Sequence, residues 1–126
     1  MSRRVLVVED NPVNLELITE VLEQEGCQVL TTHSAEAGLR LAAAERPDLI
    51  LMDLQLLDMT GYEATRRLKA SPATVAIPVL VLTAFAMEGD DLKAREAGCD
   101  GYLTKPLDLR AFRDTLDQLL PPGPAK

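Results

Sequence analysis

Five side chains that could carry out chemistry each stand at or just after the end of a short apolar run of the sequence. They are Glu9, Asp10, Asp53, Thr83 and Lys105. If the acids among them meet, three carboxylates at short range repel one another, and a hard divalent cation would relieve that repulsion. Mg²⁺ prefers oxygen ligands and usually combines one or two carboxylates with phosphate oxygens. Neither histidine nor cysteine stands beside these acids in the sequence, which disfavours zinc.

The hydroxyl and the amine complete a set that suits an anionic substrate. Lys105 supplies a point charge for an anion, and Thr83 supplies a movable hydrogen-bond donor. Such a set favours phosphoryl transfer, in which positioning and charge neutralisation do most of the work. Each residue alone also has an ordinary interpretation, because an acid after a strand is commonly a turn or helix-cap residue. Only the five together, in this order, indicate a site.

These side chains can meet only if the apolar runs are neighbouring strands of one sheet. The runs are residues 5–8, 28–32, 49–52, 79–82 and 101–103. The first, third and fourth are apolar throughout, as expected for parallel strands buried on both faces. Ligands of an open α/β sheet bind beyond the carboxyl ends of its strands, which is where the five side chains stand.

Segments with helical periodicity separate the runs. Asn11-Pro12 predicts the start of a first helix that ends at Gly26, and Ser34 predicts the start of a second that ends before Pro47. Apolar residues recur at helical spacing along the first helix; they are Val13, Leu17, Ile18, Val21 and Leu22.

Three further helices follow the third, fourth and fifth runs. They are expected to open at Thr60-Gly61, to span roughly 87–97 with a stop at Gly98, and to start at Asp108. The last has the apolar stripe Phe112, Leu116, Leu119 and Leu120, with Leu107 and Phe112 spaced as a hydrophobic staple. Strands that alternate with helices predict an α/β fold, a doubly wound parallel sheet with helices on both faces.

Length and composition set the remaining bounds. The 126 residues suit one domain over 1–120 with a flexible, proline-rich tail over 121–126. A net charge of −7 argues against intrinsic nucleic-acid binding. No apolar run approaches the roughly 18 residues of a membrane span or forms a secretory leader, so a cytoplasmic protein is expected. Cys27 and Cys99 stand beside predicted strands and are expected to be free apolar residues.

Four motifs in order resemble the response-regulator receiver family, the CheY-like superfamily. They are Val-Val-Glu-Asp-Asn at 7–11, Leu-Met-Asp at 51–53 with Gly61 eight residues on, Leu-Thr-Ala at 82–84 and Tyr-Leu-Thr-Lys-Pro at 102–106. The resemblance covers roughly residues 4–120. It implies a flavodoxin-like fold in which a five-stranded parallel sheet of order 2-1-3-4-5 is flanked by five helices.

The resemblance also implies a metal site and a phosphoacceptor. Asp53 would be the nucleophile that accepts a phosphoryl group from a histidine kinase or a histidine phosphotransfer protein. Asp10 and Asp53 would bind Mg²⁺ or Mn²⁺ directly, with the backbone carbonyl of Gln55 as a third ligand. Glu9 would act largely through metal-bound water.

A switch is implied as well. Lys105 would pair with a phosphoryl oxygen, and Thr83 would hydrogen-bond the phosphoryl group and move towards it. Tyr102 would turn inward into the space that Thr83 leaves, which changes the face formed by the fourth helix, fifth strand and fifth helix. That face would contact a downstream protein, with no direct role for nucleic acid or membrane.

One pair of positions departs from the family pattern, and other positions indicate a subgroup of the family. Leu56 and Leu57 stand where the family often has Met-Pro, which puts the loop geometry in question. Phe85 stands at a position that, in this family, borders the path of the water that hydrolyses the phosphoryl group. Its bulk is therefore expected to slow loss of that group. Residues 83–87 are similar to single-domain DivK-type receivers and to the receivers of hybrid kinases.

The residues at a few positions disfavour three other classes of protein. Haloacid-dehalogenase-type phosphatases place a second Asp two residues after the nucleophile, where this chain has Gln55. A flavodoxin would cradle phosphate in the first loop, where Glu9-Asp10 would repel it. A phosphorylation-independent pseudo-receiver would usually lack the acceptor, an acid or the lysine. We therefore expect a two-component response regulator that catalyses its own phosphorylation and dephosphorylation, not an enzyme of metabolite turnover.

Overall fold

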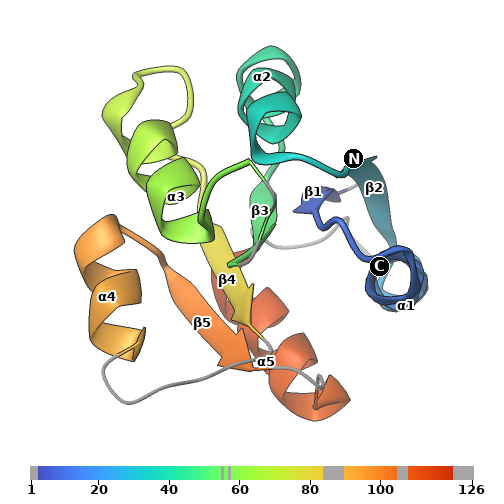
Figure 1. Ribbon diagram of the computed structural model, residues 1–126. Helices are drawn as coiled ribbons and strands as arrows, with labels where there is room; N and C mark the ends of the chain where they lie inside the picture. The colour runs from blue at the N-terminus through green and yellow to red at the C-terminus, as the bar shows by residue number, and fades with distance from the viewer. Residues whose placement is uncertain (1–2, 55, 57, 84–89, 105–107, 121–126) are drawn as a thin grey trace.

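The strands form one parallel sheet. The computed structural model describes residues 3–54, 56, 58–83, 90–104 and 108–120, without the side chains of 83, 90 and 91. The strands of this part are β1 (Arg3–Val8), β2 (Cys27–Thr32), β3 (Leu49–Asp53), β4 (Val79–Thr83) and β5 (Gly101–Thr104). Every pairing is parallel, and the order β2-β1-β3-β4-β5 confirms the predicted topology (Figure 1).

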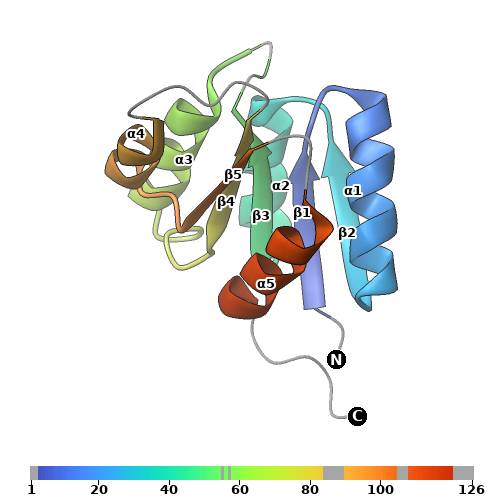
Figure 2. The ribbon, with the colours of Figure 1, turned by 90° about the horizontal axis from the view of Figure 1, so that it is seen from below.

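Helices cover both faces of the sheet. They are α1 (Pro12–Gln24), α2 (Ala35–Glu45), α3 (Gly61–Ala70), α4 (Asp90–Ala97) and α5 (Leu109–Leu119). Helices α1 and α5 lie on one face, and α2, α3 and α4 lie on the other (Figures 1 and 2). The doubly wound arrangement is thus confirmed. It leaves the carboxyl ends of the strands together at one edge of the sheet.

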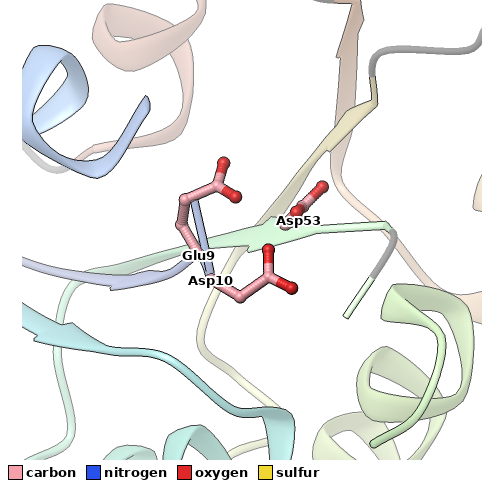
Figure 3. A group of neighbouring side chains, drawn as sticks. All are labelled: Glu9, Asp10 and Asp53. Atoms are coloured by element: carbon pink, nitrogen blue, oxygen red, sulfur yellow. The ribbon is translucent and has the colours of Figure 1, made fainter. Parts of the chain in front are cut away.

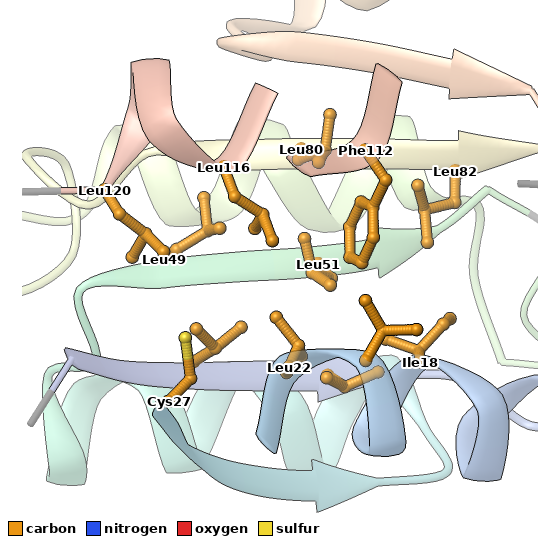
Figure 4. Close-up of a cluster of buried hydrophobic side chains, with 13 residues drawn as sticks. Ile18, Leu22, Cys27, Leu49, Leu51, Leu80, Leu82, Phe112, Leu116 and Leu120 are labelled. Carbon is orange, nitrogen blue, oxygen red and sulfur yellow. The ribbon is translucent and has the colours of Figure 1, made fainter. Parts of the chain in front are cut away.

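The core beneath α1 and α5 follows the predicted stripes for the most part. Phe112 and Leu116 of α5 are buried and pack over β1, β3 and β4 (Figure 4). Ile18 and Leu22 of α1 are buried beside them. Val13 and Leu17 share the helical spacing of these residues but are 73% and 47% exposed. The buried stripe of α1 is centred on Ile18 and Leu22. The helical turn places Val13 and Leu17 to the side of this stripe.

The predicted cap residues begin the helices. The side-chain oxygen of Asn11 accepts from the backbone N–H of Val13 and Asn14, and Asp108 does the same for the first turn of α5. The α1–β2 turn passes through Gly26 at φ +81°, and the α4–β5 turn passes through Gly98 at φ +96°. Residues 87–89, Leu107 and the tail 121–126, on which other predictions fall, lie outside the described residues.

Both cysteines are free thiols, as predicted. Burial raises the pKa of the Cys27 thiol, and it does the same for Cys99. Both thiols are therefore poor nucleophiles, and they serve as small apolar residues of the core. Within the described residues, no helix is long and apolar enough to cross a membrane.

Candidate functional site

Three carboxylates gather at the carboxyl end of the sheet. Glu9 and Asp10 follow the last residue of β1, and Asp53 is the last residue of β3. Strands β1 and β3 are neighbours in a register that pairs Val8 with Met52, so the next residues of both strands meet. One oxygen from each of the three carboxylates lies within 4.8 Å of the others (Figure 3). The predicted acidic site is thus assembled by two adjacent parallel strands.

Backbone hydrogen bonds fix the position of Glu9. Its N–H donates to the carbonyl oxygen of Thr32 at the end of β2, at 3.1 Å. Its carboxylate oxygen Oε2 accepts from the N–H of Asn11 at 3.2 Å. Asn11 in turn caps α1, so the start of that helix and the acidic site share one residue. With its side chain only 1% exposed, Glu9 has little freedom to leave the site.

Close packing of α3 fixes the position of Asp53. The N–H of Leu54 donates to the carbonyl of Leu82 at 2.8 Å, and the N–H of Gly61 donates to the carbonyl of Leu54 at 2.8 Å. A Cβ atom on Gly61 would lie 2.6 Å from the backbone oxygen of Asp53. Since that distance is far below van der Waals contact, only glycine lets α3 begin this near to Asp53.

The donor set fits a hard divalent cation. Glu9 and Asp53 are nearly buried, at 1% and 6% exposure, and Asp10 is partly exposed beside them. Like charges held together away from water are unfavourable unless a cation offsets them. All three ligand atoms are carboxylate oxygens, which suits Mg²⁺ or Mn²⁺. In the described part of the chain this is the one such acidic cluster, and it contains no histidine or cysteine.

The remaining predicted site residues are described in part. The backbone of Thr83 ends β4 opposite Thr104, at the same edge of the sheet as Asp53, but its side chain is not described. Tyr102 of β5 is half-buried and packs with the core on the side of α4. Gln55, Phe85 and Lys105 lie outside the described residues.

One residue near the site escaped prediction. Asp58, in the β3–α3 loop, accepts hydrogen bonds from the backbone N–H groups of Glu36 at 2.9 Å and Ala35 at 3.1 Å. These hydrogen bonds lower the pKa of the Asp58 carboxyl, and the bond from the N–H of Glu36 contributes most. Its sequence signal, an acid in a turn, is too common to indicate a partner 22 or 23 residues away.

Comparison with known proteins decides the family. A family model described as the response regulator receiver domain matches residues 5–117. The chain belongs to the response-regulator receiver family. Its function is accordingly that of a phosphoacceptor in two-component signal transduction, and receivers of this kind are signalling proteins, not metabolic enzymes.

Individual relatives support the same assignment. The polar-differentiation response regulator DivK of Brucella ovis is 40% identical over 120 residues, which cover 95% of this chain and 98% of that protein. The receiver domain of the sensor histidine kinase PA1611 from Pseudomonas aeruginosa PAO1 is 34% identical, with a TM-score of 0.86 over 94% of this chain and 98% of that one. That structure contains a magnesium ion coordinated in the active-site cleft.

The chemotaxis protein CheY4 of Vibrio cholerae is similar in fold. It is 25% identical, with a TM-score of 0.88 over 95% of this chain and all of that one. Receivers thus resemble this chain over nearly its whole length, in agreement with the predicted resemblance to DivK-type and kinase-linked receivers.

Proposed function

We propose that Asp53 is the residue of this receiver that accepts the phosphoryl group, in a reaction that requires Mg²⁺ or Mn²⁺. The observation that carries the proposal is the cluster of Glu9, Asp10 and Asp53 within 4.8 Å at the carboxyl end of the sheet. Asp53 is the member that ends the central strand β3, beside β4 and its terminal Thr83.

The transfer is a displacement at phosphorus. A carboxylate oxygen of Asp53 attacks the phosphorus of a phosphohistidine, a P–O bond forms, and the P–N bond breaks. The electron pair of the broken bond stays on the imidazole nitrogen, and the product is an aspartyl phosphate. Lys105 pairs with a phosphoryl oxygen, and the Thr83 hydroxyl donates to another.

The metal ligands are assigned by the same proposal. Asp10 and Asp53 would hold the ion with the backbone carbonyl of Gln55, and Glu9 would hold water near it. When bound, the ion offsets the charge of the carboxylates and of the transferred phosphoryl group. The same groups would position a water molecule to attack the phosphorus of the aspartyl phosphate, which releases inorganic phosphate and restores the Asp53 carboxylate, so the chain would promote both its phosphorylation and its dephosphorylation.

Output is proposed to leave through the face of α4, β5 and α5. Tyr102 and five neighbours line a cavity of about 330 Å³ between α4 and β5; the neighbours are Ala94, Arg95, Cys99, Asp100 and Gly101. The cavity borders Tyr102, the residue that we propose changes position when Thr83 moves. The phosphodonor is a histidine kinase or a histidine phosphotransfer protein, and the reader of the changed face is a downstream protein.

A small phosphodonor tests this function without knowledge of the kinase. The protein is incubated with acetyl phosphate and Mg²⁺ and then separated on a phosphate-affinity gel. We expect a retarded band that disappears when a chelator replaces Mg²⁺. A band that persists in chelator would contradict the metal requirement, and sustained turnover of a phosphomonoester would favour a phosphatase.

Phe85 is proposed to set the lifetime of the phosphoryl group. An aromatic ring beside the path of attacking water would hinder that attack by bulk. We expect Phe85→Ala to shorten the half-life of the phosphorylated protein by a few-fold, on the order of 1 kcal/mol in activation free energy. The half-life is measured by decay of the retarded band after the phosphodonor is removed, and equal half-lives would refute the role.

A further inference from the structure

The first turn of α2 is capped by two side chains, one of which comes from a distant loop. Ser34 precedes the helix, and its hydroxyl oxygen accepts from the N–H of Ala37 at 3.2 Å. The carboxylate of Asp58 accepts from the two N–H groups before it, those of Ala35 and Glu36, with one oxygen for each. The N–H groups that a helix start leaves without intrahelical partners are thus satisfied in part by the β3–α3 loop.

The partnership suits the charges of both elements. The N-terminus of a helix carries a partial positive charge, which favours a carboxylate there. Because Asp58 is exposed to solvent, its charge in the loop carries little desolvation cost. Hydrogen bonds from two backbone groups to one carboxylate also fix its orientation better than a single bond would.

These contacts close a ring around the acidic site. On one side, the N–H of Glu9 is bonded to Thr32, and the chain runs from Thr32 through Ser34 into α2. Asp58 then joins the start of α2 to the loop that leaves Asp53. Two backbone hydrogen bonds hold the ends of that loop. The N–H of Leu54 donates to the carbonyl of Leu82, and the N–H of Gly61 donates to the carbonyl of Leu54. Among the described residues, the hydrogen bonds of Asp58 join the middle of this loop to the start of α2, and Leu56 and Met59 of the loop pack against the apolar core on the same face.

We infer that Asp58 is a positioning residue for the metal site. Its hydrogen bonds to the start of α2 hold the β3–α3 loop in a fixed position relative to the strand end that carries Glu9. The inference rests on the proposed function, because it is this loop that carries Gln55, the proposed carbonyl ligand. The two hydrogen bonds from the start of α2 restrict the loop at Asp58.

Metal affinity tests the inference, with Ser34→Ala as the matched control. Both Asp58→Ala and Ser34→Ala remove a cap from the first turn of α2, but only the former releases the loop. We expect Asp58→Ala to weaken Mg²⁺ binding, measured by calorimetry, by about fivefold, which is less than the roughly 10-fold or greater loss typical of groups hydrogen-bonded directly to a metal ligand, because Asp58 acts through the loop. Ser34→Ala is expected to change Mg²⁺ affinity less than about twofold while it lowers thermal stability to a similar degree.

Asp58→Asn separates geometry from charge. The amide keeps one acceptor oxygen and loses the negative charge, so its Mg²⁺ affinity is expected to lie between those of wild type and Asp58→Ala. Wild-type affinity in Asp58→Ala would overturn the inference, as would an equal loss in Ser34→Ala. So would an Asp58→Asn defect equal to that of Asp58→Ala that disappears in high salt, since this marks a charge effect. Failure of the wild type itself to bind Mg²⁺ would overturn the proposed function, and this inference with it.

Discussion

Asp53→Asn is expected to lower the yield of phosphorylated protein by at least about 100-fold, because an amide oxygen is a poor nucleophile towards phosphorus. The same change removes one of three neighbouring carboxylate charges. Without metal, the variant should therefore unfold at a higher temperature than wild type, because repulsion in the folded state is relieved. With Mg²⁺ present, its stabilisation by the metal should be smaller than that of wild type. The phosphate-affinity gel and thermal unfolding give the two readouts.

The control for this variant is Asp117→Asn. Asp117 is an exposed aspartate of α5, remote in sequence from the acidic cluster, and the change in formal charge is the same. It should be phosphorylated like wild type and respond equally to Mg²⁺. Equal phosphorylation of Asp53→Asn and Asp117→Asn would show that another residue accepts the phosphoryl group.

Phe112→Ala is expected to have the largest effect on stability, about 3–5 kcal/mol in free energy of unfolding. The ring is fully buried between α5 and the central strands, in contact with the core that includes Leu51 and Leu82 (Figure 4). Its loss removes apolar burial and leaves a cavity that close-packed neighbours fill only in part. The free energy of unfolding is obtained from urea titration.

Leu109→Ala in the same helix is the matched control. Leu109 is 43% exposed, so its truncation should change the free energy of unfolding by no more than about 0.5 kcal/mol. A similar small change in Phe112→Ala would contradict the assignment of α5 as a core helix of this face. Since α5 also borders β5, loss of its packing is expected to weaken the proposed output face as well.

The fold was predictable because its signals are local. Strands buried on both faces read as unbroken apolar runs, and residues such as Asn11, Ser34 and Asp108 mark helix starts by their own side chains. The exposure of Val13 and Leu17 could not be predicted, because an apolar residue at helical spacing does not reveal how wide the buried stripe is. The tilt of α1 on the sheet decides that, and tilt depends on tertiary packing.

The site was predictable for a topological reason. Parallel strands bring their carboxyl ends to one edge, so acids at the ends of the first and third runs had to meet once the order of strands was known. Asp58 could not be predicted in this way. Its partners depend on the path of a loop and on the position of α2, and neither follows from the residue types around it.

Phosphorylation of Asp53 is tested most directly by locating the phosphoryl group after reaction with acetyl phosphate and Mg²⁺. Reduction of an aspartyl phosphate with borohydride converts the aspartate to homoserine, which mass spectrometry of peptides can assign to one position. We expect homoserine at position 53 alone, and none when a chelator replaces Mg²⁺ or when Asp53 is changed to Asn. Homoserine at another aspartate, or the same yield at position 53 in chelator, would contradict the proposed function.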